Sequence, residues 1–213
     1  MEWYEAEVRQ IESARSVRNI PTDPVVFYGS SSIRLWENLA GDLGSPRAVN
    51  VGFGGSTLEA CAYFFERLVL PLQPCSLVVY AGDNDLGDGR SPRQVLSFYR
   101  ALSSKVEKRL PGVPFAFLSI KPSPAREPLL NRIRRTNSLI RHEMETRECG
   151  LFVNIFDPML DAKEKPRPEL FSPDGLHMGP DGYRVWAEVL TPYRHRIFVE
   201  DCSSLQTRPL SLP

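Results

Sequence analysis

Five short, predominantly apolar runs recur along the sequence, separated by segments with helical spacing. The first, at 25–29, reads Val-Val-Phe-Tyr-Gly, and the others occupy 48–52, 76–82, 114–120 and 151–155. Each run has the length of a strand, and the first three end at glycine. Continuous apolar runs of this length are typical of strands buried on both faces, as in parallel sheets. The pattern predicts a five-stranded parallel sheet covered by helices on both faces, a three-layer α/β/α sandwich.

The helical segments between these runs complete the expected domain. Residues 2–19 form one apolar stripe, and we expect this N-terminal helix, within 1–20, to pack on the main body. The helix expected at 92–110 has a clear start, because Ser91 and Gln94 match a capping box. Further helices are expected at 56–69, at 128–147 and after Pro180. We expect a single domain over 1–200, and a loose tail over 201–213, which has no apolar period.

The composition of the chain indicates which partners and which cellular compartment to expect. The chain has 213 residues, with 26 Lys and Arg against 26 Asp and Glu. This balance gives no reason to expect a nucleic-acid partner, which favours a basic excess. No run approaches the roughly 20 apolar residues of a membrane span, and the N-terminus lacks a signal-peptide pattern. Four scattered cysteines argue against zinc and against a disulfide framework. We therefore expect a cytoplasmic protein without a membrane partner.

Polar residues follow the predicted strands, where α/β proteins bind their ligands. Ser31 follows the first strand and is either a helix cap or a nucleophile lifted above the sheet edge. Gly55 follows the second strand and either makes a turn or presents a backbone N–H to a ligand. Asn84 follows the third strand and either forms an Asx turn or donates its amide to an oxyanion. Each position alone leaves both interpretations open.

The loop after the fifth strand places Asp174 three residues before His177. A carboxylate beside an imidazole fixes the tautomer of the ring and stabilises its protonated form, so the histidine becomes an effective general base. The chain has three histidines. His142 falls in a predicted helix and His195 lies near a helix end between two arginines, so His177 is the candidate for chemistry.

Four sequence blocks, one after each of strands one, two, three and five, resemble the SGNH hydrolase superfamily, also called GDSL esterases and lipases. The blocks are Phe27 to Ile33, Asn50 to Thr57, Gly82 to Asp85 and Asp174 to His177. The resemblance covers 25–190 and rests on all four blocks occurring in order. It implies a flavodoxin-like SGNH hydrolase fold and a serine esterase that needs no metal or organic cofactor.

The resemblance also implies roles for individual residues. Ser31 corresponds to the nucleophile, His177 to the general base and Asp174 to its partner. The oxyanion donors correspond to the Ser31 N–H, the Gly55 N–H and the Asn84 amide. One position departs from the family pattern, because Ser30 stands where the family usually has aspartate. This departure makes Ser32 a second candidate for the nucleophile, and the spacing from Gly29 favours Ser31.

The substrate is expected to be a small ester. Lys121 and Arg126 lie in a proline-rich loop after the fourth strand, as solvated charges or as contacts to an anionic or sugar-like part of the substrate. Phe53, Leu86 and Phe171 are candidates for an apolar wall. We expect a short acyl group such as acetyl, because the sequence contains no lid-like apolar helix suited to long chains.

Two other functions share these features. The same residues could transfer the acyl group to an alcohol other than water. Alternatively, Ser30 in place of aspartate could mark a flavodoxin-like binding module that does not hydrolyse esters, with phosphate bound by the hydroxyls of Ser30 to Ser32 at a helix N-terminus. The sequence leaves the oligomeric state open, a homodimer included.

Overall fold

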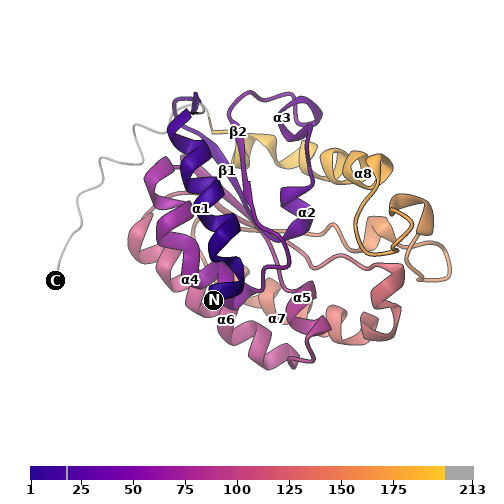
Figure 1. Cartoon of the computed structure of the whole chain (residues 1–213). Coiled ribbons are helices and arrows are strands. Elements are labelled where there is room, and N and C mark those ends of the chain that lie inside the picture. Colours follow the sequence, from indigo (N-terminus) through magenta and orange to yellow (C-terminus); the bar gives the residue numbers. More distant parts are fainter. Residues whose placement is uncertain (18, 200–213) are drawn as a thin grey trace.

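A single five-stranded sheet organises the chain in a computed structural model that describes residues 1–17 and 19–199 (Figure 1). All strand pairs are parallel, in the order β2-β1-β3-β4-β5. The strands are β1 (Val25–Gly29), β2 (Ala48–Gly52), β3 (Ser76–Tyr80), β4 (Phe115–Leu118) and β5 (Gly150–Val153). The predicted sheet is therefore confirmed in strand number and direction.

Helices cover both faces of the sheet, as the apolar runs predict. The longer helices are α1 (Glu2–Val17), α4 (Leu58–Leu68), α6 (Pro92–Arg109), α7 (Leu130–Glu145) and α8 (Pro180–Leu190). The short ones are α2 (Ser31–Arg34), α3 (Leu39–Asp42), α5 (Asp83–Gly87) and α9 (Arg194–Ile197). In Figure 1, α1, α4, α6 and α7 lie on one side of the sheet, and α2, α3 and α8 on the other.

The side chains of each strand contribute to two separate hydrophobic cores, because successive side chains point to opposite faces of the sheet. In β1, Val26 and Tyr28 belong to the core beneath α4, α6 and α7, while Val25 and Phe27 belong to the core beneath α8. Trp36 and Trp186 are fully buried on the α8 side, with ring centroids 5.9 Å apart. The central strands β1, β3 and β4 therefore have no solvent-exposed face, which explains their continuous apolar sequences.

The strand order creates a switch point at the carboxyl end of β1. The chain leaves β1 for β2 on one side, and then returns to β3 on the other side of β1. In flavodoxin-like sheets of this order the crevice between the loops after β1 and β3 is the usual ligand site. The predicted site residues Ser31 and Asn84 belong to these two loops.

Several element boundaries differ from the sequence prediction. The third strand ends at Tyr80 rather than at 82, because Gly82 adopts a φ of 118° and is the N-cap of α5. The fourth strand is limited to Phe115–Leu118. Residues Pro124–Leu129 form a 3₁₀ turn, so the helix expected from 128 begins at Leu130. The capping box of α6 is present as predicted, with both reciprocal hydrogen bonds between Ser91 and Gln94.

The remaining 3₁₀ segments lie in the connections. They are Leu70–Leu72, Asp157–Met159, Pro168–Leu170 and Thr191–Tyr193. In the described part of the chain, no helix is long and apolar enough to cross a membrane. The expected tail at 201–213 lies outside the described residues.

Candidate active site

Ser31 begins α2 immediately after the carboxyl end of β1. Gly29 makes this turn possible, because its φ is 138° and an added Cβ would lie 1.8 Å from the carbonyl oxygen of Tyr80. The N–H of Ser30 then donates to that same carbonyl at 2.9 Å. The residue before the nucleophile candidate is therefore held against the neighbouring strand β3 by its backbone.

The side chains of Ser31, His177 and Asp174 form one continuous row. Nε2 of His177 lies 3.2 Å from Oγ of Ser31, and Nδ1 of the same ring lies 2.6 Å from Oδ2 of Asp174. Because an ionised carboxylate only accepts hydrogen bonds, the proton of the neutral ring sits on Nδ1, which leaves Nε2 as an acceptor for the serine hydroxyl. This is the arrangement that a general base needs beside a nucleophile.

The backbone of its own loop holds Asp174 in its ionised form. Oδ1 of Asp174 accepts from the N–H groups of Leu176 at 2.9 Å and of His177 at 3.0 Å. These donors, led by Leu176, together with the bond to the imidazole lower the pKa of Asp174 to about 2. Donors aimed at the charged form produce such a shift. The carboxylate thus faces His177 with a full charge at neutral pH.

Two of the three candidate oxyanion donors belong to the segments that follow β2 and β3. Gly55 is exposed, with a φ of 64°, and an added Cβ would meet nothing within 4 Å. Nδ2 of Asn84 donates to the carbonyl of Ser56 at 3.0 Å, which ties the two loops together. An amide nitrogen carries two hydrogens, so this bond leaves Asn84 one more donor. Neither the Gly55 N–H nor the Ser31 N–H has a hydrogen-bond partner among the described residues.

The neighbouring serines have different environments from Ser31. The side chains of Ser30 and Ser32 are buried, and their hydroxyl oxygens have no hydrogen-bond partner among the described residues. Only the middle hydroxyl of these three contacts His177. The geometry thus agrees with the spacing in favouring Ser31 over Ser32. It also weakens the idea of a phosphate site made by all three hydroxyls.

Two polar residues that the sequence reading did not select support these loops. Asn50 in β2 donates to the carbonyl of Ile33 at 2.6 Å and accepts from the Gly52 N–H at 3.0 Å, which fixes α2 to the sheet. Oδ2 of Asp85 accepts from the N–H of Leu58, in the first turn of α4, at 2.9 Å. Burial raises the pKa of Asp85 to about 6. In the sequence, the supporting role of Asn50 is indicated only by the presence of an asparagine inside an apolar strand.

Lys121 does not lie at the mouth of the site, so that prediction is wrong. Its side chain is 1% exposed, and Nζ pairs with Oδ2 of Asp83 at 3.1 Å. Nζ also lies 5.6 Å from the centre of the Tyr80 ring. A buried lysine charge is strongly destabilising without a partner, and the Asp-Asn-Asp sequence after β3 supplies one.

The apolar wall expected from Phe53 and Leu86 is also wrong. Phe53 is fully buried and Leu86 is 1% exposed, and both belong to the core beneath α4 and α6. Phe171 is half-buried and forms an isolated antiparallel bridge with Met178, within the loop that carries His177. Of the three predicted wall residues, Phe171 alone is partly exposed, and it packs against the core beneath α8.

Arg126 lies between the loops after β3 and β5. Its guanidinium packs on α5, because an added Cβ on Gly87 would lie 2.4 Å from Nη2. The preceding residue, Ala125, donates its N–H to the carbonyl of Gly175 at 3.0 Å. The residue is half-buried, and its Nε is buried without a hydrogen-bond partner among the described residues. Arg126 therefore borders both loops that carry predicted site residues.

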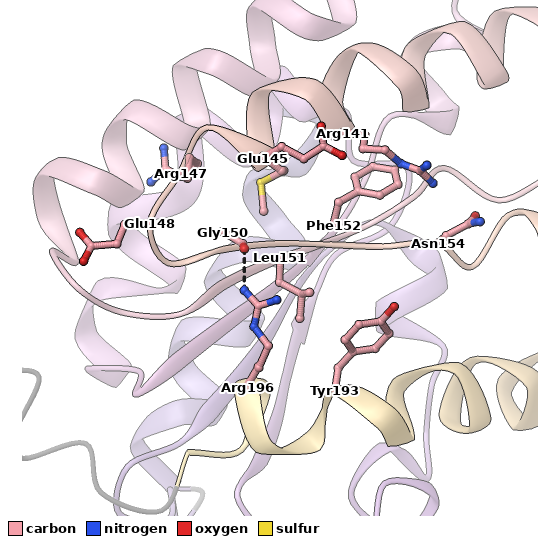
Figure 2. A pocket seen from close by; sticks show the side chains of 11 residues that line it. Arg141, Glu145, Arg147, Glu148, Gly150, Leu151, Phe152, Asn154, Tyr193 and Arg196 are labelled. Carbon is pink, nitrogen blue, oxygen red and sulfur yellow. Dashed lines mark hydrogen bonds between the residues drawn. The ribbon is translucent and has the colours of Figure 1, made fainter.

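A hollow of about 520 Å³ lies elsewhere, along the outer edge of β5 (Figure 2). Figure 2 shows Arg196 reaching the backbone of this edge strand, where it donates to the carbonyl of Gly150 at 2.9 Å. Arg141 covers the ring of Phe152, with its Cζ 5.0 Å from the ring centre. Charged side chains in these positions protect an edge strand from pairing with other strands. None of the predicted site residues lines this hollow.

Comparison with known structures supports the fold. A protein from Streptococcus pneumonia named after platelet activating factor superimposes with a TM-score of 0.75 and 21% identity, over 90% of this chain and 94% of that one. A GDSL-like lipase from Bacteroides thetaiotaomicron gives 0.73 and 19%, over 88% and 97%. An acetyl-xylooligosaccharide esterase variant from Geobacillus stearmophilus gives 0.64 and 14%, over 86% and 98%.

The sequence itself assigns the family. No curated protein matches the chain significantly. The sequence model of the GDSL-like Lipase/Acylhydrolase family, however, matches residues 22–185, from just before β1 into α8. This range contains the loops after all five strands. The chain therefore belongs to the GDSL-like lipase/acylhydrolase family, and is an ester hydrolase of that family.

Proposed function

We propose that the chain hydrolyses small carboxylic esters with a short acyl group, through an acyl-enzyme intermediate on Ser31. The observation that carries the proposal is the row of contacts from Ser31 through His177 to Asp174, with separations of 3.2 and 2.6 Å. A base within reach of a hydroxyl, oriented in turn by a third group, marks an activated nucleophile.

Acylation begins with the serine hydroxyl. Nε2 of His177 takes the proton as Oγ of Ser31 bonds to the ester carbonyl carbon, and the carbonyl π electrons move onto its oxygen. Asp174 stabilises the imidazolium that forms. Collapse of the tetrahedral intermediate breaks the bond to the alcohol, which leaves with the proton from Nε2. Water then repeats the sequence on the acyl-enzyme, releasing the acid and restoring Ser31.

The developing oxyanion requires donors that are already in place. The N–H groups of Ser31 and Gly55 and the remaining Asn84 hydrogen are the candidates, because they come from three loops at the same sheet edge. The bond from Asn84 to Ser56 limits how the amide can turn. Losing one such donor typically lowers kcat by about a hundred- to a thousand-fold.

The small number of exposed apolar side chains supports the proposal of a short acyl group. Phe53 and Leu86 lie in the core, so of the three predicted wall residues only Phe171 is partly exposed. Among the described residues, the strongly exposed large hydrophobic side chains are Met1, Trp3 and Tyr63, none of them in the loops after β4 or β5. One structural neighbour is named an acetyl-xylooligosaccharide esterase, which concerns the same short acyl group.

The cation at Arg126 leads us to propose that the substrate also carries an anionic group. Its guanidinium has no carboxylate partner among the described residues and packs on α5, while the N–H of the preceding Ala125 donates to Gly175 in the loop of His177. A carboxylate or phosphate on the substrate would supply the missing acceptor through charge-assisted hydrogen bonds. With Lys121 already paired to Asp83, Arg126 alone inherits the role expected of the two cations.

Two matched serine variants test the proposal. Ser31→Ala and Ser32→Ala each remove one hydroxyl from adjacent positions of α2, and hydrolysis of p-nitrophenyl acetate reports the loss. We expect Ser31→Ala to lower kcat by about 10⁴-fold or more, and Ser32→Ala to leave it within about three-fold. Equal activity of Ser31→Ala and wild type would contradict the proposal. A series of p-nitrophenyl esters of increasing chain length tests the acyl preference, which fails if long chains react fastest.

A further inference from the structure

The N-terminal helix α1 reaches the oxyanion loop after β2 with two hydrogen bonds. Oε2 of Glu7 accepts from the N–H of Gly54 at 2.8 Å, and the hydroxyl of Tyr4 donates to the carbonyl of Gly55 at 3.2 Å. The family match starts at residue 22, so α1 precedes the matched region. A segment outside the matched region thus contacts the loop that carries a proposed oxyanion donor.

These two bonds hold the peptide units on either side of that donor. The N–H of Gly54 belongs to the peptide unit before the Gly54–Gly55 bond, and the carbonyl of Gly55 belongs to the unit after it. The unit between them carries the Gly55 N–H. Because peptide units are planar, fixing both neighbours leaves the middle unit only the torsions of two glycines to change its direction.

The glycines make such a restraint necessary. Without a Cβ, Gly54 and Gly55 have access to far more of φ/ψ space than other residues, and Gly55 already occupies the left-handed region at a φ of 64°. Gly55 is exposed and open on its Cβ side, so no side chain presses on the loop there. The direction of the Gly55 N–H therefore depends on contacts from outside the loop.

Glu7 also joins the oxyanion loop to the helix of the nucleophile. Its Oε1 lies 3.5 Å from Nε of Arg34, the last residue of α2, which begins at Ser31. The ring of Tyr4 packs edge-on against Phe53 and Phe64, with ring centroids 5.5 and 6.2 Å away. One turn of α1 thus contacts the loop of Gly55 and the helix of Ser31 together.

We infer that Tyr4 and Glu7 are positioning residues that aim the Gly55 N–H at the oxyanion. The inference rests on the proposed function, since it needs Gly55 as an oxyanion donor. Neither residue touches the reacting atoms. Their contribution belongs to kcat, because a donor aimed at the oxyanion acts more strongly in the transition state than on the ground-state ester.

A purely structural role for α1 can be separated from this positioning role. Arg67 of α4 binds the same helix through Glu5 at 2.9 Å and Glu12 at 2.7 Å, without contacting the glycine loop. Glu12→Gln therefore weakens the attachment of α1 while leaving both hydrogen bonds to the loop in place. It is the matched control for loss of helix docking.

The experiment compares Tyr4→Phe, Glu7→Ala, Glu7→Gln and Glu12→Gln in the full chain. Tyr4→Phe keeps the ring packing and removes the hydroxyl. Glu7→Ala removes the acceptor at a helical position where alanine is well tolerated, and Glu7→Gln restores an acceptor oxygen. The measurements are kcat and KM for p-nitrophenyl acetate, the rate of inactivation by diethyl p-nitrophenyl phosphate, and the thermal midpoint.

We expect Glu7→Ala and Tyr4→Phe to lower kcat and the inactivation rate by about ten-fold, less than loss of a whole donor, with KM nearly unchanged. Glu7→Gln should recover most of the Glu7→Ala loss, and Glu12→Gln should lower only the thermal midpoint. Unchanged kcat in both loop-contact variants, or an equal kcat loss in Glu12→Gln, would overturn the inference while an inactive Ser31→Ala upheld the proposed function. An active Ser31→Ala would overturn both.

Discussion

Nε2 of His177 lies 3.2 Å from Oγ of Ser31, although 146 positions separate the two residues in the sequence. The sheet order places β3 and β4 between β1 and β5. Three strand spacings of ~4.8 Å therefore separate β1 from β5, so the ends of β1 and β5 are about 14 Å apart. The long loop after β5 crosses this distance. Its two 3₁₀ turns, Asp157–Met159 and Pro168–Leu170, are built into that crossing.

Replacing Asp174 by asparagine tests whether the carboxylate orients the histidine. The amide keeps the shape of the side chain, but it cannot hold the Nδ1–H tautomer in the same way as a carboxylate. We expect kcat for p-nitrophenyl acetate to fall by roughly 10³- to 10⁴-fold with little change in KM. Because the pKa of Asp174 is about 2, this carboxylate does not set the acid limb of activity above about pH 4. A loss below ten-fold would contradict this role.

Asp85 should make the stability of the protein fall as pH rises. Burial raises its folded pKa to about 6 from an ordinary 3.8, so between these values the native state holds a proton that the unfolded state has lost. Unfolding free energy should therefore decrease by about 3 kcal/mol from this group between pH 4 and 7. Asp85→Asn removes the titration and should remove that decline. Urea unfolding across this range measures both proteins, and parallel profiles would count against the prediction.

Lys121 and Asp83 should behave as a buried pair in which each needs the other. Lys121→Met leaves the Asp83 carboxylate buried without its partner, and we expect a loss of roughly 3–5 kcal/mol in unfolding free energy. The double variant Lys121→Met with Asp83→Asn removes both charges and should recover most of that loss. Chemical denaturation of four proteins, namely the wild type, Lys121→Met, Asp83→Asn and the double variant, gives the coupling energy. An additive double variant would mean that the pair contributes nothing.

Arg126 should discriminate between esters by charge. Phenyl acetate and 4-acetoxybenzoate share an acyl group, and only the second carries a carboxylate. In Arg126→Gln we expect kcat/KM for 4-acetoxybenzoate to fall about ten-fold, the value of one charge-assisted contact, while phenyl acetate stays within about two-fold. Equal losses on the two esters would indicate that Arg126 supports the loop rather than the substrate.

Much of the fold follows from the sequence because burial on both faces leaves a visible pattern. In the continuous run at Val25–Gly29, Val26 is buried in one core and Phe27 in the other, so a polar side chain on either face would be buried. Element ends were less predictable. Gly82 could continue a strand or precede a helix, and its positive φ, with the Ile120 side chain packed where a Cβ would lie, decides between them.

The sequence predicts a residue of the candidate site where its partners are close in the sequence. It does not where contacts between distant parts of the chain determine the position of the side chain. Asp174 and His177 are three apart, and their hydrogen bonds lie within that loop. The position of Lys121 depends on Asp83, which lies 38 positions away. Similarly, Tyr4 and Gly55 are 51 positions apart, so an amphipathic helix pattern at the N-terminus gives no sign of the hydrogen bond between them.

The most direct test of the account is where a fluorophosphonate attaches. Trypsin releases residues 19–34 as one peptide containing Ser30, Ser31 and Ser32, so fragmentation of the labelled peptide by mass spectrometry can separate the three hydroxyls. We predict stoichiometric labelling on Ser31 in the wild type, none in Ser31→Ala, and labelling slowed by about a hundred-fold or more in His177→Ala. Labelling of Ser32 instead, or ester hydrolysis by a wild-type protein that takes no label at this peptide, would contradict the account.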